Sequence, residues 1–352
     1  MMQRESKPDL TVAICAYNSE KRIGLVLESL AQQKVPEGLR WELLVINNAS
    51  KDGTHKLVME MGERLGLPFR VVYEGTPGLA NARRRATLEA ASDLLSFPDD
   101  DTVLSPDWIV QCVRFLSEHP DAGIIGAKVL PLFEDASLKP PDFEDRFAGL
   151  LSLYDHGNIA RRLKFPEDPS PVGAGMSGRT ALFRLIFDEF RTMNVGRSPD
   201  SLSGGEDLEA IFIAYRMGWE IWYVPALCTH HFIPRERLTE AYRDKWIIDT
   251  ASCNALVAIL AGLCPRGNRW SWFWSWIRTQ SLVLKYSILG WLPKRLHPKL
   301  VKSDFYRRYY HSKAKGIRDL VFHSRSVDRI FRLIDSHRRQ SDERPTEAAP
   351  CI

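Results

Sequence analysis

The chain has 352 residues, a formal charge of +4 and a globular composition with 44% hydrophobic residues. These values exclude a disordered or collagen-like chain and allow one large domain or two smaller ones. Residues 293–340 hold fourteen Lys and Arg against four Asp and Glu, so the C-terminal part is basic. Because no run of 18 uncharged apolar residues and no apolar N-terminal leader occurs, we expect neither a spanning helix nor a signal peptide. Six cysteines without paired spacing are typical of free thiols in a reducing compartment.

Strand-like and helix-like segments alternate through the first hundred residues. Apolar, β-rich runs at 10–16, 41–46, 69–73 and 94–97 predict four strands. The alternation predicts a doubly wound, mostly parallel α/β sheet flanked by helices. The loops after the first, second and fourth strands should then form a nucleotide crevice at one sheet edge. No Gly-x-Gly-x-x-Gly or P-loop motif is present, which disfavours a Rossmann dinucleotide site and a P-loop NTPase.

Three adjacent carboxylates, Asp99, Asp100 and Asp101, follow the fourth strand. Such neighbours repel one another unless a cation neutralises them, and oxygen ligands suit Mg²⁺ or Mn²⁺. Because side chains alternate along an extended chain, Asp99 and Asp101 should face one side and Asp100 the other. The triplet predicts an Asp-x-Asp clamp for a metal and a ribose or sugar hydroxyl. A solvated acidic turn explains it equally well.

The middle of the chain continues the pattern with one long interruption. Residues 106–116 predict a helix and residues 122–126 a strand. The irregular segment 128–171 is of the kind that often forms a lid or an acceptor surface. The small residues at 172–178 follow, and Gly175 among them allows either close backbone approach to a ligand or a plain tight turn.

An acidic pair, Glu206 and Asp207, begins the next predicted helix. Two preceding glycines favour a site there, although acidic residues in a first helical turn are expected from the helix dipole alone. A strand at 219–224 leads to His231, which is either a third metal ligand or a structural histidine.

The last third contains apolar segments at 251–263 and 271–292, with Trp270, Trp272, Trp274 and Trp276 at every second position. Clustered tryptophans beside a basic segment are typical of a membrane interface. Helices that pack over the body of the protein are the alternative.

Five motifs of this sequence stand in the order and spacing found in family 2 inverting glycosyltransferases with the GT-A fold. They are residues 12–18, 47–54, 78–83, 97–101 and 205–207. The chain resembles in particular the bacterial exopolysaccharide and hormogonium-polysaccharide transferases of this family. The resemblance covers about residues 9–240.

The resemblance implies a role for each matching residue. Contacts with a nucleotide sugar are expected from Ala16, Tyr17, Asn18, Asn47, Arg83, Asp99, Asp100, Trp108, Gly175 and Arg237. Asp101 would hold the metal with Asp99 and His231. Asp207 would be the catalytic base and Glu206 the alternative base. Relatives usually carry an aspartate in place of Asn47, and an amide both donates and accepts hydrogen bonds, so UDP-, GDP- and dTDP-sugars all stay open as donors.

The implied activity is metal-dependent transfer of a sugar from a nucleotide-diphosphate sugar to a hydroxyl of a glycan or lipid-linked glycan, in surface polysaccharide biosynthesis. We expect Mg²⁺ or Mn²⁺ as cofactor, a cytoplasmic location on the inner face of the plasma membrane, an anionic membrane surface as a candidate partner, and no nucleic acid. The alternative is a sugar-nucleotide-binding or nucleotidyltransferase-like protein without glycosyl transfer. That class usually has a Gly-rich basic loop after the first strand, where this chain has residues 17–20.

These expectations divide the chain into four parts. They are a flexible N-terminus at 1–8, a GT-A glycosyltransferase domain at 9–240, a helical, Trp-rich and basic extension at 241–339, and a disordered tail at 340–352. The domain itself would comprise a nucleotide-sugar half at 9–127 and an acceptor half at 128–240.

Overall fold

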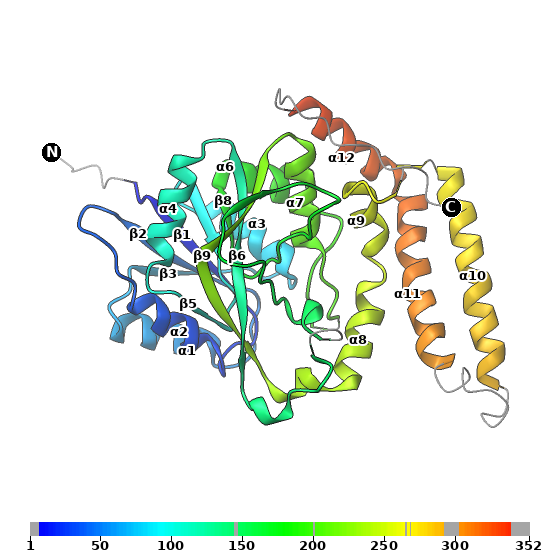
Figure 1. Cartoon of the computed structure of the whole chain (residues 1–352), viewed down its shortest axis with the longest axis horizontal. Helices are drawn as coiled ribbons and strands as arrows, with labels where there is room; N and C mark the ends of the chain where they lie inside the picture. Colours follow the sequence, from blue (N-terminus) through cyan, green and yellow to red (C-terminus); the bar gives the residue numbers. More distant parts are fainter. Residues whose placement is uncertain are drawn as a thin grey trace.

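The computed structural model describes residues 7–143, 147–199, 201–264, 266–267, 269–291 and 303–338. A central sheet has helices on both faces, and further helices stand side by side along one flank (Figure 1). The tail expected at 340–352 and most of the expected flexible N-terminus lie outside the described residues.

The N-terminal half of the sheet consists of four parallel strands in the order β3-β2-β1-β4. They are β1 (Leu10–Ala16), β2 (Trp41–Asn47), β3 (Phe69–Tyr73) and β4 (Leu94–Phe97). The helices that connect them are α1 (Ile23–Ala31), α2 (Thr54–Arg64) and α3 (Leu79–Glu89). Helices cover both faces of such a sheet, which agrees with the largely apolar sequences of its strands, and the predicted α/β alternation is confirmed.

The second half of the sheet makes it mixed rather than purely parallel. β8 (Met176–Arg179) runs antiparallel to both β4 and β6 (Ala122–Phe133), and β9 (Glu220–Ile233) runs parallel to β6. β5 (Thr102–Leu104) and β7 (Arg161–Leu163) each pair antiparallel with β9. The described strands thus form one sheet of nine.

Short helices complete this part of the chain. The α-helices are α4 (Trp108–Glu118), α6 (Thr180–Arg184) and α7 (Glu206–Arg216). The shorter turns are η1 (Ala136–Leu138), η2 (Gly149–Leu151), the π-helical η3 (Leu185–Phe190) and η4 (Arg235–Leu238).

Strands β6 and β9 are longer than the sequence predicts. They remain paired as far as Phe133 and Ile233, with a register shift after Ala127. His231 therefore lies within β9 rather than after a strand, and the first residues of the segment expected to be irregular belong to β6. The apolar pattern missed this extension because Pro131 and polar residues of β9 interrupt it, while the long-range pairing of the two strands maintains it.

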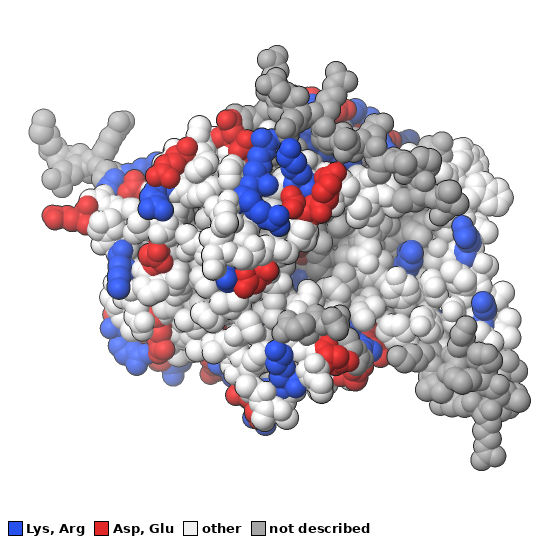
Figure 2. All heavy atoms as spheres, viewed as in Figure 1, with Lys and Arg blue, Asp and Glu red and all other residues white. Residues whose placement is uncertain are grey.

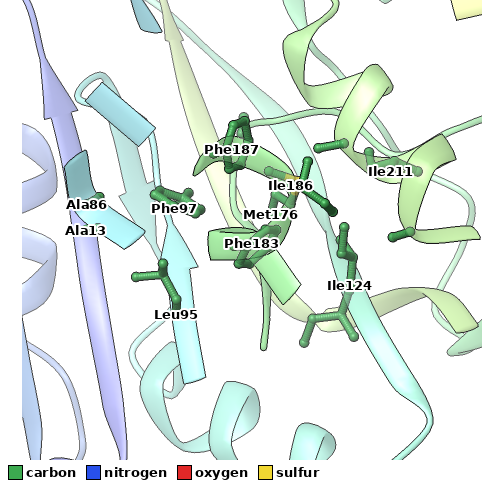
Figure 3. Close-up of a cluster of buried hydrophobic side chains, with 14 of the residues drawn as sticks. Ala13, Ala86, Leu95, Phe97, Ile124, Met176, Phe183, Ile186, Phe187 and Ile211 are labelled. Atoms are coloured by element: carbon green, nitrogen blue, oxygen red, sulfur yellow. The ribbon is translucent and has the colours of Figure 1, made fainter. Parts of the chain in front are cut away.

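Aromatic packing fixes the end of β4, where the carboxylates begin. Phe97 meets Phe183 edge to face, with ring centroids 5.3 Å apart, and also contacts Phe187 (Figure 3). Leu95 and Met176 belong to the same buried cluster, which joins β4 and β8 to α6 and η3. Such an edge-to-face pair stabilises the fold by about 0.5–1.5 kcal/mol beyond the hydrophobic effect of burying the two rings.

The C-terminal flank contains five described helices, which are α8 (Glu240–Thr250), α9 (Asn254–Leu260), α10 (Arg269–Trp291), α11 (Ser303–Phe322) and α12 (Ser324–Ser336). α11 packs between α10 on one side and α8 and α9 on the other, so α10 is outermost (Figure 1). None of the helices within the described residues is sufficiently long and apolar to cross a bilayer.

Candidate active site

A cavity of about 410 Å³ lies beside the carboxyl ends of β1, β2 and β4. Loops after these strands form one wall, and the N-terminal ends of α3 and α7 form another. Residues of α8 and α9 close it from the C-terminal flank. The crevice predicted at this sheet edge is therefore present in the structure.

Of the three carboxylates after β4, Asp99 and Asp101 face one side and Asp100 faces the other, as the alternation predicts. Ligand atoms of Asp99, Asp101 and His231 all lie within 4.8 Å of one another. Asp100 instead accepts hydrogen bonds from Arg22 Nε at 3.0 Å and from the hydroxyl of Ser19. Two carboxylates of the triplet can thus share a cation, while the third anchors the loop after β1.

Asp101 is buried among cationic groups. Arg237 donates to its Oδ2 at 3.0 Å, and His231 Nε2 lies 3.2 Å from its Oδ1. Burial would raise the pKa of Asp101, but the charges of His231, Arg237 and Arg22 lower it well below the usual range. Burial and the neighbouring charge of Asp101 raise the pKa of Asp99. Asp101 is therefore the more acidic member of this pair.

The donor set fits a hard divalent cation. Nδ1 of His231 lies 2.7 Å from the carbonyl oxygen of Leu151, which can only accept, so Nδ1 carries a proton. Nε2 of His231 therefore faces Asp101 Oδ1, and Arg237 Nη1 lies 3.3 Å from the same nitrogen. A divalent cation bound here would be held by the two carboxylates, which suit Mg²⁺ and Mn²⁺, with Nε2 as a nitrogen ligand.

The acidic pair at the start of α7 divides into a buried and a more accessible carboxylate. Glu206 is 3% exposed and accepts from Arg83 at 2.9 Å. Burial, with a further contribution from the charge of Asp207, raises the pKa of Glu206 to about 7. Asp207 is only partly buried, and its Oδ2 accepts from the backbone N–H of Gly173 at 2.8 Å.

The cavity brings together most of the residues predicted from the sequence. Those on its wall are Tyr17, Arg83, Asp99, Asp100, Asp101, Glu206, Asp207 and Arg237. Those that lie off the wall are Ala16, Asn18, Asn47, Trp108, Gly175 and His231. His231 still reaches the site through Asp101.

Two of the residues off the wall, Trp108 and Gly175, pack against each other. Trp108 is fully buried and donates from Nε1 to Ser96 in β4, so it supports the wall without facing the cavity. Gly175 has a φ of +81°, and a Cβ there would lie 2.6 Å from the Trp108 ring. The glycine is therefore required by backbone conformation and by Trp108 beneath it, and a ligand contact from either residue stays a prediction.

The loop residues after β1 and β2 are tied to each other. Asn47 Oδ1 accepts from Ser50 N, and Asn18 Oδ1 accepts from Lys51 N at 2.8 Å. Asn48, not Asn47, lines the cavity, where its Oδ1 accepts from Gly78 N at 2.9 Å. A contact between Asn47 and a base stays a prediction.

Sequence reasoning missed several residues of the wall. Arg22 has no local signal, because its partner Asp100 lies 78 positions away. Gly173 could have been found in the small-residue run, since a Cβ there would meet both Arg83 and Asp207 within 3 Å. Arg197 also lines the cavity, and although burial opposes its charge, Tyr242 and the site carboxylates raise its pKa overall.

The profile of glycosyl transferase family 2 matches residues 11–187, which is half of the chain. This chain belongs to glycosyl transferase family 2. The cavity, with its paired carboxylates, is thus the candidate active site of a glycosyltransferase.

Relatives with known names differ in how much of their length this glycosyltransferase covers. The succinoglycan biosynthesis protein ExoM of Rhizobium meliloti (strain 1021) is 28% identical over 240 residues, 67% of this chain and 71% of ExoM. The poly(ribitol-phosphate) beta-N-acetylglucosaminyltransferase TarS of Staphylococcus aureus (strain Mu50) is 28% identical over 109 residues, 31% of this chain and only 19% of TarS.

Among solved structures, a mannosyltransferase of Pyrobaculum calidifontis in complex with GDP-Man and Mn²⁺ superposes with a TM-score of 0.49 at 17% identity. The superposition covers 94% of this chain and 80% of the mannosyltransferase.

Proposed function

We propose that this glycosyltransferase carries out metal-dependent, inverting transfer of a sugar from a nucleotide-diphosphate sugar to a hydroxyl group in polysaccharide biosynthesis. The observation that carries the proposal is that Asp99, Asp101 and Asp207 line one cavity, with His231 in contact with Asp101. The cavity has room for a nucleotide sugar, since ligand pockets usually measure about 300–1,000 Å³.

In this proposal Asp101, Asp99 and His231 hold the divalent cation. A cation bound there would neutralise the negative charge that develops on the leaving diphosphate. Arg237, whose guanidinium already lies at Asp101, would bind the diphosphate through its remaining N–H groups.

Asp207 is the proposed base. The hydrogen bond from Gly173 N–H orients its carboxylate, and the side chain is more accessible than that of Glu206. Asp207 would take the proton of the acceptor hydroxyl while the acceptor oxygen bonds to C1 of the sugar. The bond from C1 to the diphosphate oxygen breaks on the opposite face, so the nucleoside diphosphate leaves and the anomeric centre inverts in one step. Glu206 suits the role less well because its carboxylate is buried in an ion pair with Arg83.

The acceptor is proposed to be a glycan or a lipid-linked glycan. A lipid-linked acceptor would place the enzyme at the cytoplasmic surface of a membrane, on anionic lipid. The division of the chain into a GT-A domain at 9–240 and a helical extension at 241–339 belongs to the same proposal, with the extension as the membrane-facing part.

The test is a calorimetric titration with UDP, GDP and dTDP, each with and without Mn²⁺, followed by assay of the corresponding sugar nucleotides for release of the nucleoside diphosphate. We expect one nucleotide to bind in a metal-dependent manner and its sugar derivative to be turned over. If no nucleotide binds under either condition, the assignment of this cavity as a donor site is wrong.

A further inference from the structure

The outermost helix, α10, exposes a continuous apolar stripe. Its members are Trp270, Trp274, Ile277, Leu284 and Ile288, with Ser281 in the gap. At 100° per residue they fall within a narrow sector of the helix surface. Trp270 is 72% exposed, Trp274 67% and Leu284 62%. Monomeric soluble proteins rarely leave a contiguous apolar face of this kind uncovered.

The opposite face of α10 already has a partner within the chain. Tyr286 stacks on Tyr306 and Tyr310 of α11, with ring centroids 5.1 and 5.5 Å apart. Trp272 and Thr279 are buried on the inner side. The stripe is therefore not needed to attach α10 to the rest of the protein.

The charges on α10 are all positive. Arg278 and Lys285 border one side of the stripe, Arg269 lies on the other, and the helix contains no Asp or Glu. In Figure 2 the right-hand edge, where Figure 1 places α10 and α11, carries Lys and Arg among uncharged atoms and no Asp or Glu in view. Lys and Arg stems can lie along an apolar surface while their charged ends reach anionic groups.

This charge pattern distinguishes between the possible occupants of the stripe. Its 3.5-residue spacing would also suit pairing with a second copy of α10. Two copies, however, would place the cations of both helices along the seam, with no acidic residue on either helix to compensate. An anionic bilayer matches both features at once, since tryptophan side chains favour the interfacial region and each nearby cation adds about 1 kcal/mol of attraction.

We propose that the exposed face of α10, comprising the stripe and its bordering cations, docks onto the surface of an anionic lipid bilayer. The helix lies in the interface with Trp270 and Trp274 among the headgroups and does not cross the membrane. The inference gives a defined surface to the membrane location proposed above, and it rests on the proposed function only for the choice of a lipid-linked acceptor.

The test is co-flotation of the full chain with vesicles of phosphatidylcholine and phosphatidylglycerol, compared with vesicles of phosphatidylcholine alone. We expect the wild type to float with the anionic vesicles and much less with the neutral ones. The double variant Trp270→Ser/Trp274→Ser should lose binding to both. Arg278→Glu/Lys285→Glu should weaken partition into anionic vesicles at least about tenfold and leave the weak binding to neutral vesicles unchanged.

Matched controls separate this surface from general surface properties. Ile159→Ser removes an apolar side chain that is 79% exposed elsewhere, and Lys56→Glu/Arg64→Glu makes the same charge change on α2. Both should float like the wild type. The proposal is overturned if the wild type binds neither vesicle, if the controls lose as much binding as the α10 variants, or if sedimentation shows a dimer that Trp270→Ser/Trp274→Ser converts to a monomer. Calorimetric nucleotide titration of the α10 variants distinguishes failure of membrane docking from failure of the donor site. Nucleotide binding should be unchanged in these variants.

Discussion

Arg83 and Glu206 form an ion pair of 2.9 Å in which the two side chains are only 3% and 4% exposed. The pair joins α3 to the first turn of α7 across 123 positions of the sequence. Because the guanidinium occupies one carboxylate oxygen of Glu206 and burial raises its pKa to about 7, the neighbouring Asp207 is left as the carboxylate available to an acceptor.

The two acidic residues should respond differently to amide substitution. Asp207→Asn keeps an oxygen for the Gly173 N–H but cannot take a proton, so turnover should fall about 10²- to 10⁴-fold while donor binding is retained. Glu206→Gln leaves Arg83 buried beside a neutral partner and should destabilise the protein by about 3 kcal/mol. Steady-state turnover and calorimetric donor titration measure the first change, and chemical denaturation measures the second. Undiminished turnover in Asp207→Asn would rule out this residue as the base.

Adjacent aspartates provide a matched pair for the metal site. Asp101→Ala removes the carboxylate nearest His231 and Arg237, and it should abolish the Mn²⁺ dependence of nucleotide binding. Asp100→Asn weakens the contact with Arg22 and should lower stability by about 1–3 kcal/mol while the Mn²⁺ dependence remains. Nucleotide titration with and without Mn²⁺ checks both variants. If both variants lose the Mn²⁺ dependence of nucleotide binding equally, the opposite orientation of Asp100 and Asp101 does not determine which of them binds the metal.

Local patterns were enough to predict the first half of the sheet. The bounds of β1, β3 and β4 agree with the apolar runs, because these strands are largely apolar and end at turn residues. The opposite orientation of Asp99 and Asp100 also followed from a local rule, the alternation of side chains along an extended chain.

Features that depend on distant contacts could not be predicted in this way. The extension of β9 to include His231 depends on its pairing with β6, and the partnership of Arg22 with Asp100 depends on the packing of the loop after β1. The hydrogen bond from Ser50 N to the side-chain oxygen of Asn47 was not predicted either, and a contact of Asn47 with a base stays a prediction. A motif gives the position of such a residue along the chain but not which of its neighbours the loop will turn towards the cavity.

Gly66 and Gly175 both have a positive φ, so alanine variants of the two can distinguish backbone strain from side-chain crowding. Gly175 has a φ of +81° and the Trp108 ring beneath it, whereas Gly66 has a φ of +64° and open space where a Cβ would lie. Gly66→Ala should therefore cost about 1–2 kcal/mol from the backbone alone. Gly175→Ala should cost about 1–3 kcal/mol more, because the tryptophan must move. Denaturant unfolding of the two variants gives the difference, and equal costs would show that Trp108 does not crowd this position.

The buried carboxylate of Glu209 should make stability depend on pH. It is fully buried and accepts hydrogen bonds from Met193 N and from the backbone and side-chain amides of Asn194, but burial is the larger effect and raises its pKa from 4.5 to about 7. The folded state therefore binds this proton more tightly than the unfolded state. The stabilisation that protonated Glu209 gives to the fold is complete below pH 4.5 and is lost as the pH rises towards 7. The loss should reach about 3 kcal/mol. Unfolding free energies measured between about pH 5 and 8 should fall with pH in the wild type and fall less steeply in Glu209→Gln. The same slope in both proteins would show that Glu209 is already ionised in the fold at the acidic end of this range.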